Sequence, residues 1–143
     1  MIEPRLSVVT LGVHDLARSR AFYCDGLGWV ASPASTESIV FIQAGFVALA
    51  LFPWDFLAED ANLPPGGDGF RGVTLAYNTR TREEVDELMR LAAASGGRGM
   101  RPAAETPWGG YAGYFADPDG HLWEAVWNPH FELGPRGELI LPK

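Results

Sequence analysis

Tyr114 and Glu124 are the two side chains of this sequence best placed to do chemistry together. The segment from Asp117 to Gly120 suits a type I turn, in which proline fixes φ early and glycine takes the final left-handed position. If Asp117 pairs with His121, counting outward along the two flanking strands puts Tyr114 opposite Glu124 on one face. The carboxylate could accept a hydrogen bond from a ligand or act as a general base. Alternatively, Tyr114 and water could satisfy Glu124 in a purely structural role.

Two short segments rich in aromatic residues could cover a ligand. Pro107 to Tyr111 precedes a predicted strand, and its glycines predict a mobile loop that carries Trp108 and Tyr111. Such a loop could close over a flat or cationic ligand, or pack on the rim of a cleft or on a dimer partner. Trp54 and Phe56 have the same character, and a lid or a subunit interface would explain them.

The other reactive residue types indicate little chemistry. Cys24 is the only cysteine, which excludes an intrachain disulfide and a thiolate zinc site. Asp25 beside it disfavours the thiolate form, so we assign Cys24 no catalytic role. Arg98 and Arg101 flank a predicted strand and could meet an anionic ligand, but we interpret them first as surface charges.

Strands and a helix must position these residues, and the first half of the chain predicts one such unit. Apolar and β-branched residues predict a strand over residues 6–13. Asp15 fits a helix N-cap, and Gly26 and Gly28 end the helix that follows. Three strands are predicted after it, over residues 29–32, 39–43 and 46–52.

The second half repeats this order after a segment rich in proline and glycine. The strand predicted over residues 72–78 has the same Val-Thr-Leu core as the first strand, and Thr81 and Glu84 form a capping box that opens a helix. Strands are predicted over residues 99–105, 112–116 and 121–127. The sequence therefore predicts an α+β fold of two βαβββ modules in pseudo-repeat. The expected divisions are a first module at 5–53, a linker at 54–70, a second module at 71–128 and a tail at 129–143.

Two such modules can form a curved sheet around a cleft, because a helix covers one face of each sheet and leaves the other open. Strand alternation puts small and apolar residues on the open faces. The residues expected to bind a ligand there are Val8, Thr10, Ala50, Gly72 and Thr74, with Trp108 and Tyr111 from the aromatic loop. The residues expected to face the helices include Val73, Leu75, Trp123 and Trp127.

The sequence resembles the vicinal oxygen chelate superfamily at both ends of the repeat. The resemblance rests on Val-Thr-Leu-Gly-Val-His-Asp-Leu near the start, with Phe22-Tyr23 and Leu27-Gly28-Trp29 after it, and on Asp-Pro-Asp-Gly-His-Leu-Trp-Glu ending at Glu124. This superfamily includes the glyoxalase I, fosfomycin-resistance, extradiol dioxygenase and bleomycin-resistance proteins. The resemblance covers residues 5–128 and implies a glyoxalase-like fold and a homodimer.

The resemblance also implies where a metal would be bound. In the metalloenzymes of this superfamily, two histidines or similar ligands on the first strands and a glutamate on the last strand hold a divalent metal. Transferred by position, the histidine places fall on Val8 and Gly72 and a further carboxylate place falls near Ala50, so only Glu124 matches. One carboxylate does not hold zinc, iron, manganese or nickel, which need three or more protein ligands. We therefore expect no metal cofactor.

Composition and net charge limit the classes of molecule that the protein is expected to bind. The chain is 47% hydrophobic with a net charge of −7, which predicts a globular protein that binds neither nucleic acid nor an anionic membrane. No apolar run approaches the ~20 residues needed to cross a bilayer, and the N-terminus lacks a signal pattern. We expect a cytoplasmic protein with a small-molecule ligand.

These observations favour a protein that, like the bleomycin-resistance binders, holds a small organic ligand in an apolar cleft without metal. The alternative is an enzyme of the same superfamily, a lyase, isomerase, transferase or dioxygenase, with Glu124 as base or metal ligand and Tyr114 assisting. A third hypothesis is an interaction module whose own aromatic residues fill the cleft.

Overall fold

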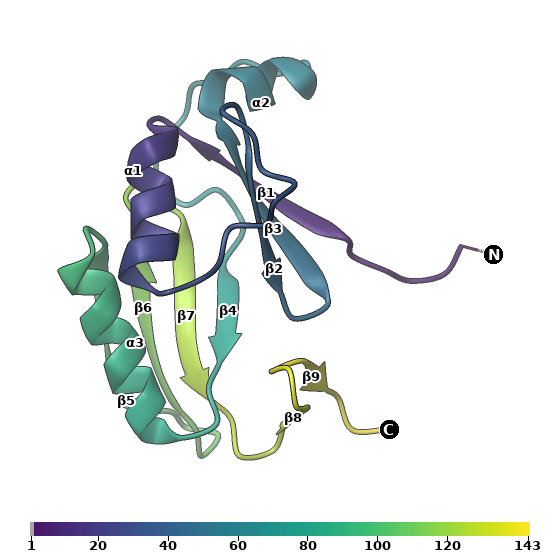
Figure 1. Ribbon diagram of the computed structural model, residues 1–143. Coiled ribbons are helices and arrows are strands. Elements are labelled where there is room, and N and C mark those ends of the chain that lie inside the picture. The colour runs from purple at the N-terminus through teal and green to yellow at the C-terminus, as the bar shows by residue number, and fades with distance from the viewer. Residues whose placement is uncertain (1) are drawn as a thin grey trace.

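The computed structural model describes residues 2–143 as two similar units of strands and helices, followed by a short C-terminal hairpin (Figure 1). The first unit consists of β1 (Val8–Val13), α1 (Leu16–Arg20), the π-helical turn η1 (Ala21–Gly26), β2 (Val40–Ala44) and β3 (Val47–Pro53). A further helix, α2 (Trp54–Asp60), leads to the second unit. That unit consists of β4 (Leu75–Asn78), α3 (Arg82–Ala94), β5 (Arg98–Glu105), β6 (Tyr111–Ala116) and β7 (Leu122–Trp127). The hairpin pairs β8 (Glu132–Leu133) with β9 (Leu139–Ile140).

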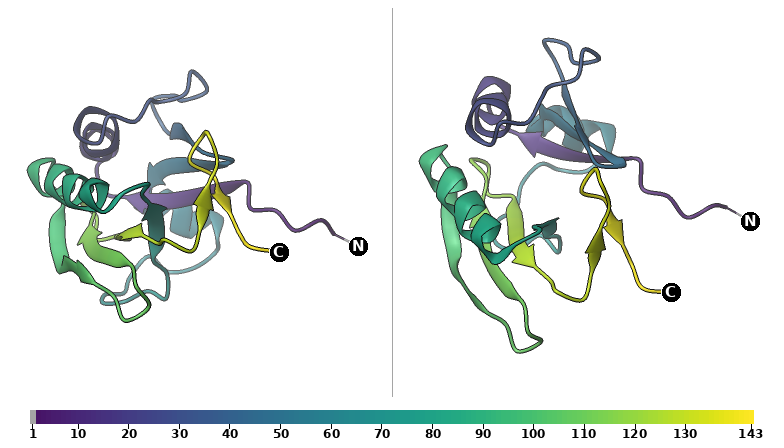
Figure 2. Two further views of the ribbon diagram at one scale, coloured as in Figure 1. Left: turned by 90° about the horizontal axis from the view of Figure 1, so that it is seen from below. Right: turned by 60° about the horizontal axis from the view of Figure 1, so that its bottom comes forward.

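The two units have related sheets. In the first sheet, β3 lies between β1, to which it is parallel, and β2, to which it is antiparallel. In the second, β7 lies between the parallel β4 and the antiparallel β6, and β5 pairs with the far edge of β6. Figures 1 and 2 show α1 and α3 on one side of the sheets and the β8–β9 hairpin on the other. This arrangement confirms the predicted α+β class.

The β6–β7 hairpin has the predicted register. The amide of Asp117 donates to the carbonyl of His121 at 2.9 Å, and the amide of Gly120 donates to the carbonyl of Asp117 at 3.0 Å. Gly120 has a φ of 88°, as the turn requires. Pairing continues outward until Tyr114 lies opposite Glu124. The turn sequence alone therefore predicted which two side chains would be neighbours.

Both long helical segments begin at the predicted caps. The side chain of Asp15 accepts a hydrogen bond from the amide of Arg18 at 3.0 Å. The hydroxyl of Thr81 accepts one from the amide of Glu84 at 3.3 Å, and the Glu84 carboxylate accepts one from the amide of Arg80 at 2.9 Å. The Asp15 and Thr81 side chains each satisfy an amide of the first helical turn that has no partner within the helix.

Two predicted strands are shorter than expected. The strand at residues 29–32 is reduced to an isolated bridge between Ala31 and Ile42. The strand at residues 72–78 begins only at Leu75, the first residue that pairs with β7. Gly72 has a φ of 84°, which is incompatible with an extended strand, and Val73 is 64% exposed rather than turned toward the helices.

The segment predicted as an irregular linker contains α2. Trp54 and Leu57 lie on one helical face and are half-buried, while the stretch rich in proline and glycine begins only after the helix. The Trp54 ring covers Gly12 so closely that an added Cβ would come within 3.2 Å of it. The indole N–H donates to the carbonyl of Pro65 at 3.0 Å. Trp54 therefore packs against residues of its own chain, and neither a lid nor a subunit interface is needed to explain it.

One hydrophobic core joins the two units. Its larger members come from β1, β2 and β3, from the first helical segment, from α3 and from β6 and β7: Leu11, Phe22, Tyr23, Ile42, Leu49, Leu51, Leu88, Phe115 and Trp123. Trp123 is 7% exposed, which confirms its predicted place in the core. Within residues 2–143, no helix is both long and apolar enough to span a membrane.

Candidate functional site

The second sheet brings one side chain from each of its four strands into a single row. Arg101 of β5 pairs with Tyr114 of β6, Tyr114 pairs with Glu124 of β7, and Glu124 pairs with Ala76 of β4. Directly paired residues share a face of a sheet, and Phe115, which alternates with Tyr114, belongs to the core shared with α3. The four residues, here called the Tyr114 row, therefore lie on the face turned away from α3.

The row combines a phenol, a carboxylate and a guanidinium. Burial raises the pKa of the Tyr114 phenol above its usual value and the neighbouring Glu124 carboxylate raises it further, whereas Arg101 lowers it. The phenol is therefore protonated at neutral pH and can donate a hydrogen bond. Within residues 2–143, neither Arg101 nor Glu124 takes part in an ion pair. Arg101, interpreted from sequence as a surface charge, is thus a neighbour of the two predicted catalytic residues.

The other residues predicted to line the cleft differ in how accessible they are. Val8 and Thr10 lie on β1 and are exposed. Ala50 lies in the central strand of its sheet and is 0% exposed, so its predicted contact with a ligand is wrong for this conformation. Gly72 and Thr74 are exposed and precede β4 instead of lying within it.

Tyr111 lies on the wrong face to share a ligand with the Tyr114 row. It is the first residue of β6 and pairs with Trp127. Its phenol donates to the Asp86 carboxylate at 2.7 Å, and the Arg82 guanidinium lies 4.9 Å from the centre of its ring. Because strand alternation turns Tyr111 toward α3, its expected place in the cleft is corrected.

Trp108 lies in a tight turn closed by hydrogen bonds, within the segment expected from sequence to be a mobile loop. The amide of Thr106 donates to the carbonyl of Gly110 at 3.0 Å, and the Thr106 hydroxyl accepts from the amide of Gly110 at 2.9 Å. The Trp108 ring folds directly over Gly110 and is 44% exposed. Its accessible face remains free at the surface of the turn.

The residues around Glu124 do not fit a divalent metal. Among residues 2–143, no three histidine, cysteine, aspartate or glutamate side chains are grouped so that they could hold a metal ion. His14 stacks on Trp54 with ring centres 4.6 Å apart, and His121 Nε2 lies 2.6 Å from the carbonyl oxygen of Gly12. Both imidazoles therefore already have partners near the C-terminal end of β1. Glu124 is left as a single carboxylate without the further protein ligands that such a metal needs.

The observed strand pairing also changes which residue of the second unit corresponds to Val8 of the first. Thr10 pairs with Ala50, and Ala76 pairs with Glu124. If Ala50 corresponds to Glu124, then Val8 corresponds to Thr74 rather than to Gly72. Neither assignment supplies a histidine, and the poor fit to a metal is unchanged.

The turn carboxylate Asp117 has buried partners that the sequence did not reveal. Its Oδ2 accepts a hydrogen bond from the Tyr23 phenol at 2.7 Å, and the Tyr23 oxygen accepts one from the indole of Trp123 at 3.0 Å. Its Oδ1 accepts from the amides of Asp119 and His121, each at 2.9 Å. Burial raises the pKa of Asp117, and burial followed by the charge of Asp117 raises that of Tyr23.

Asp119 binds the first unit directly. One carboxylate oxygen accepts from the amide of His14 and from the guanidinium of Arg18, both at 2.9 Å, and the other accepts from the Ser19 hydroxyl at 2.9 Å. The available signal was that Ser19 and Tyr23, four residues apart, are polar residues on an otherwise apolar helical stripe. The network joins the β6–β7 turn to the first helical segment, and no buried side-chain nitrogen or oxygen within residues 2–143 lacks a partner.

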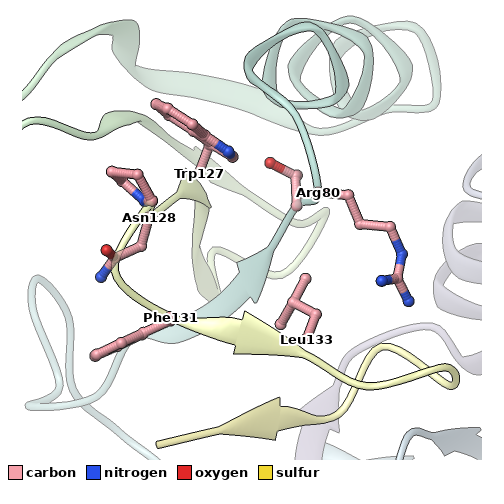
Figure 3. A pocket seen from close by; sticks show the side chains of 7 residues that line it. Arg80, Trp127, Asn128, Phe131 and Leu133 are labelled. Atoms are coloured by element: carbon pink, nitrogen blue, oxygen red, sulfur yellow. The ribbon is translucent and has the colours of Figure 1, made fainter. Parts of the chain in front are cut away.

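A hollow of about 320 Å³ lies between the end of β7 and the C-terminal hairpin (Figure 3). It is lined by Thr79, Arg80, Trp127, Asn128, Pro129, Phe131 and Leu133. The Arg80 side chain points away from Trp127, and its guanidinium donates to the carbonyl of Gly134 at 2.7 Å. The charge of Arg80 therefore holds the hairpin rather than facing the hollow, and the Tyr114 row remains the candidate site.

Comparison with known proteins agrees with this architecture. The model of the Glyoxalase/Bleomycin resistance protein/Dioxygenase superfamily matches residues 5–125. A crystal structure of a glyoxalase-related enzyme from Fulvimarina pelagi is 37% identical, with a TM-score of 0.89 over 97% of this chain and 99% of that one.

Two further solved structures are more distant. A lactoylglutathione lyase from Agrobacterium tumefaciens is 26% identical, with a TM-score of 0.66 over 89% of this chain and 96% of that one. A glyoxalase/bleomycin resistance protein/dioxygenase family enzyme from Burkholderia phytofirmans PsJN is 20% identical, with a TM-score of 0.77 over 87% and 98% of the two chains, and shows the fold alone. No functionally curated protein matches the sequence.

Proposed function

The chain belongs to the Glyoxalase/Bleomycin resistance protein/Dioxygenase superfamily, and on that premise we propose that it binds a small organic ligand over the Tyr114 row without a resident metal ion. The observation that carries the proposal is the half-buried pair of Tyr114 and Glu124, with no ion pair to Glu124 within the described chain. A protonated phenol beside a carboxylate offers a donor and an acceptor at one point. Such polar groups fix the orientation of a ligand whose apolar part rests on the remaining surface.

The proposal includes no metal because the side chains beside Glu124 are not usual metal ligands. Glu124 is paired with Ala76 on one side and Tyr114 on the other, and neither is a usual metal ligand. Metal analysis of the purified protein tests this part. Stoichiometric metal that is lost in a Glu124→Gln variant would overturn it.

The binding itself is testable by a small-fragment screen followed by NMR of 15N-labelled protein. Bleomycin and a library of small organic fragments serve as probes, and the expected result is a set of shifted amides confined to the parts of β4, β5, β6 and β7 around the row. Tyr114→Phe and Glu124→Gln should weaken a bound fragment by about threefold to tenfold each, because each removes one hydrogen-bonding group. Shifts that never include the row would contradict the proposal.

An enzyme is the second candidate, and the names of two similar structures favour it. The Fulvimarina pelagi protein is called a glyoxalase-related enzyme and the Agrobacterium protein a lactoylglutathione lyase. Here Glu124 would take a proton from bound substrate while Tyr114 donates a hydrogen bond to the developing negative charge. In Glu124→Gln, ligand binding that persists while turnover is lost would support catalysis. Weakened binding in Glu124→Gln, with no turnover by the variant or by the wild-type protein, would support sequestration of the ligand.

We further propose that the protein is a homodimer of the cytoplasm. Exposed apolar side chains on the N-terminal segment and β1, including Leu6 at 63% and Val8 at 43%, support an interface between copies. Light scattering coupled to gel filtration should give twice the mass of 15.5 kDa. A monomer at micromolar concentration would contradict the dimer and leave the ligand proposal standing.

A further inference from the structure

We infer that the ligand of the Tyr114 row is a short zwitterion, whose anionic group pairs with Arg101 and whose amine pairs with Glu124. The inference rests on the proposed function, because it names the class of ligand for the same site. Its basis is the order of charges across the sheet: guanidinium on β5, phenol on β6 and carboxylate on β7.

Arg101 is available because it takes part in no ion pair among the residues that the structure describes. Arg5, Arg18, Arg82 and Arg90 form the ion pairs found among residues 2–143. Glu105, the acidic residue of the same strand, pairs with Arg82 instead of with Arg101. In a protein of net charge −7, this leaves a local positive group where most of the surface repels anions.

Arg101 and Glu124 are also too far apart to neutralise each other directly. Their strands are separated by β6, so their backbones lie about 10 Å apart at the usual spacing of neighbouring strands. No nitrogen of Arg101 comes within ion-pair distance of Glu124. A molecule with opposite charges at its two ends would bridge this gap and pair with both.

Tyr114 lies between the two charges and suits either end of such a ligand. Its raised pKa keeps the phenol protonated, so that it can donate to an anionic group near Arg101 or to Glu124 itself. A simple cation would meet repulsion at Arg101, and a simple anion would meet repulsion at Glu124. A neutral ligand would cover both charges without pairing them, which is unfavourable.

The experiment uses three probes that differ only in their end groups: 6-aminohexanoate, hexanoate and hexylamine. Each is titrated into the 15N-labelled full chain, and affinity is read from amide shifts around Tyr114 and Glu124. The zwitterion should bind about threefold to tenfold more tightly than either singly charged probe, the range expected for partly exposed charged contacts. Arg101→Gln should reduce zwitterion affinity to that of hexylamine, and Glu124→Gln should reduce it to that of hexanoate.

Arg98→Gln is the matched control, because Arg98 is an exposed arginine at the start of the same strand. It should leave all three affinities unchanged. Equal affinities for the three probes, or equal losses in Arg98→Gln and Arg101→Gln, would overturn the inference. Shifts around the row that do not depend on Arg101 would do so while leaving the proposed function intact. If neither these probes nor the fragment screen shifts the row, both fail.

Discussion

Asp117 shows how one side chain can serve both a turn and the core. It accepts two backbone amides of its own turn through Oδ1 and the Tyr23 phenol through Oδ2, and it is 3% exposed. A carboxylate that is removed from water needs such donors, because each unpaired buried polar group costs free energy. The same residue therefore shapes the hairpin that presents Glu124 and fastens it to the first helical segment.

Asp117→Ala should lower the free energy of unfolding by about 2 to 4 kcal/mol, because it leaves the Tyr23 phenol and two amides without their acceptor. Asp117→Asn is the matched variant, since an amide oxygen of the same shape can still accept from the backbone. It should cost clearly less than Asp117→Ala. Urea denaturation followed by tryptophan fluorescence measures both, and equal losses would contradict the role given to these hydrogen bonds.

The raised pKa of Asp117 also predicts a pH dependence of stability. The folded protein holds the proton of Asp117 more tightly than the unfolded chain does. The resulting stability is fully present below the unfolded pKa of about 3.9 and is lost as pH rises through the folded pKa. Relative to Asp117→Asn, the wild-type protein should therefore become less stable as pH rises through the mildly acidic range. Thermal unfolding of both proteins at several pH values tests this, and a change of the opposite sign would mean that the pKa is lowered.

The sequence predicted that Tyr114 pairs with Glu124 but did not predict that Arg101 lies beside them, and the difference has a physical reason. The former pair is fixed by counting along a single tight turn, which is local information. Arg101 reaches the row only through β5–β6 pairing, which has irregularities on both sides of Arg101. Such bulges change which residue faces which side, and simple alternation along the strand does not reveal them.

At the scale of the elements, Gly120 is the point on which the β6–β7 register depends. Its φ of 88° lies in the left-handed region, and nothing lies within 4 Å of an added Cβ. The requirement for glycine there is therefore one of backbone conformation and not of space.

Gly120→Ala should destabilise the protein by about 1 to 2 kcal/mol. Gly99→Ala is the control, because Gly99 also has open space around its Cβ position but lacks a positive φ. It should be close to neutral. Thermal or urea unfolding of the two variants compares them directly, and equal losses would show that the conformation of Gly120 is not the cause.

α2 and the β8–β9 hairpin mark the limit of element prediction from this sequence. Prolines and glycines near α2 suggested an irregular linker, yet Trp54 folds back onto Gly12 and anchors a helix there. That contact joins residues more than forty positions apart. Propensity alone does not contain it, because tertiary packing decides whether a short helix forms.

At the scale of the whole molecule, the C-terminal hairpin connects the two units. Arg80 of the second unit donates to the carbonyl of Gly134, and the Arg136 guanidinium lies 4.5 Å from the centre of the Phe46 ring in the first. Figures 1 and 2 place this hairpin on the side of the sheets opposite α1 and α3. The hairpin therefore spans both units on the side to which the Tyr114 row is turned.

Arg136→Ala should loosen the hairpin without unfolding the protein, because an exposed contact of a cation with an aromatic ring contributes about 0.5 to 1 kcal/mol. Hydrogen exchange at the Gly134 amide, which donates to the carbonyl of Glu138, should accelerate by about twofold to fivefold. Phe46→Ala should reproduce the effect and Arg98→Ala should not. Unchanged exchange in both Arg136→Ala and Phe46→Ala would show that this contact does not hold the hairpin.

Asp117 and Asp119 accept hydrogen bonds from the first unit, and these bonds show what holds the two halves together. The units meet through these side chains and a shared core, whereas the exposed stretch from Gly66 to Gly69 only carries the backbone across. A protease cut in that stretch would leave two fragments that remain associated. The two halves therefore pack together as two different subunits would. The connecting stretch keeps each half at a high effective concentration relative to the other.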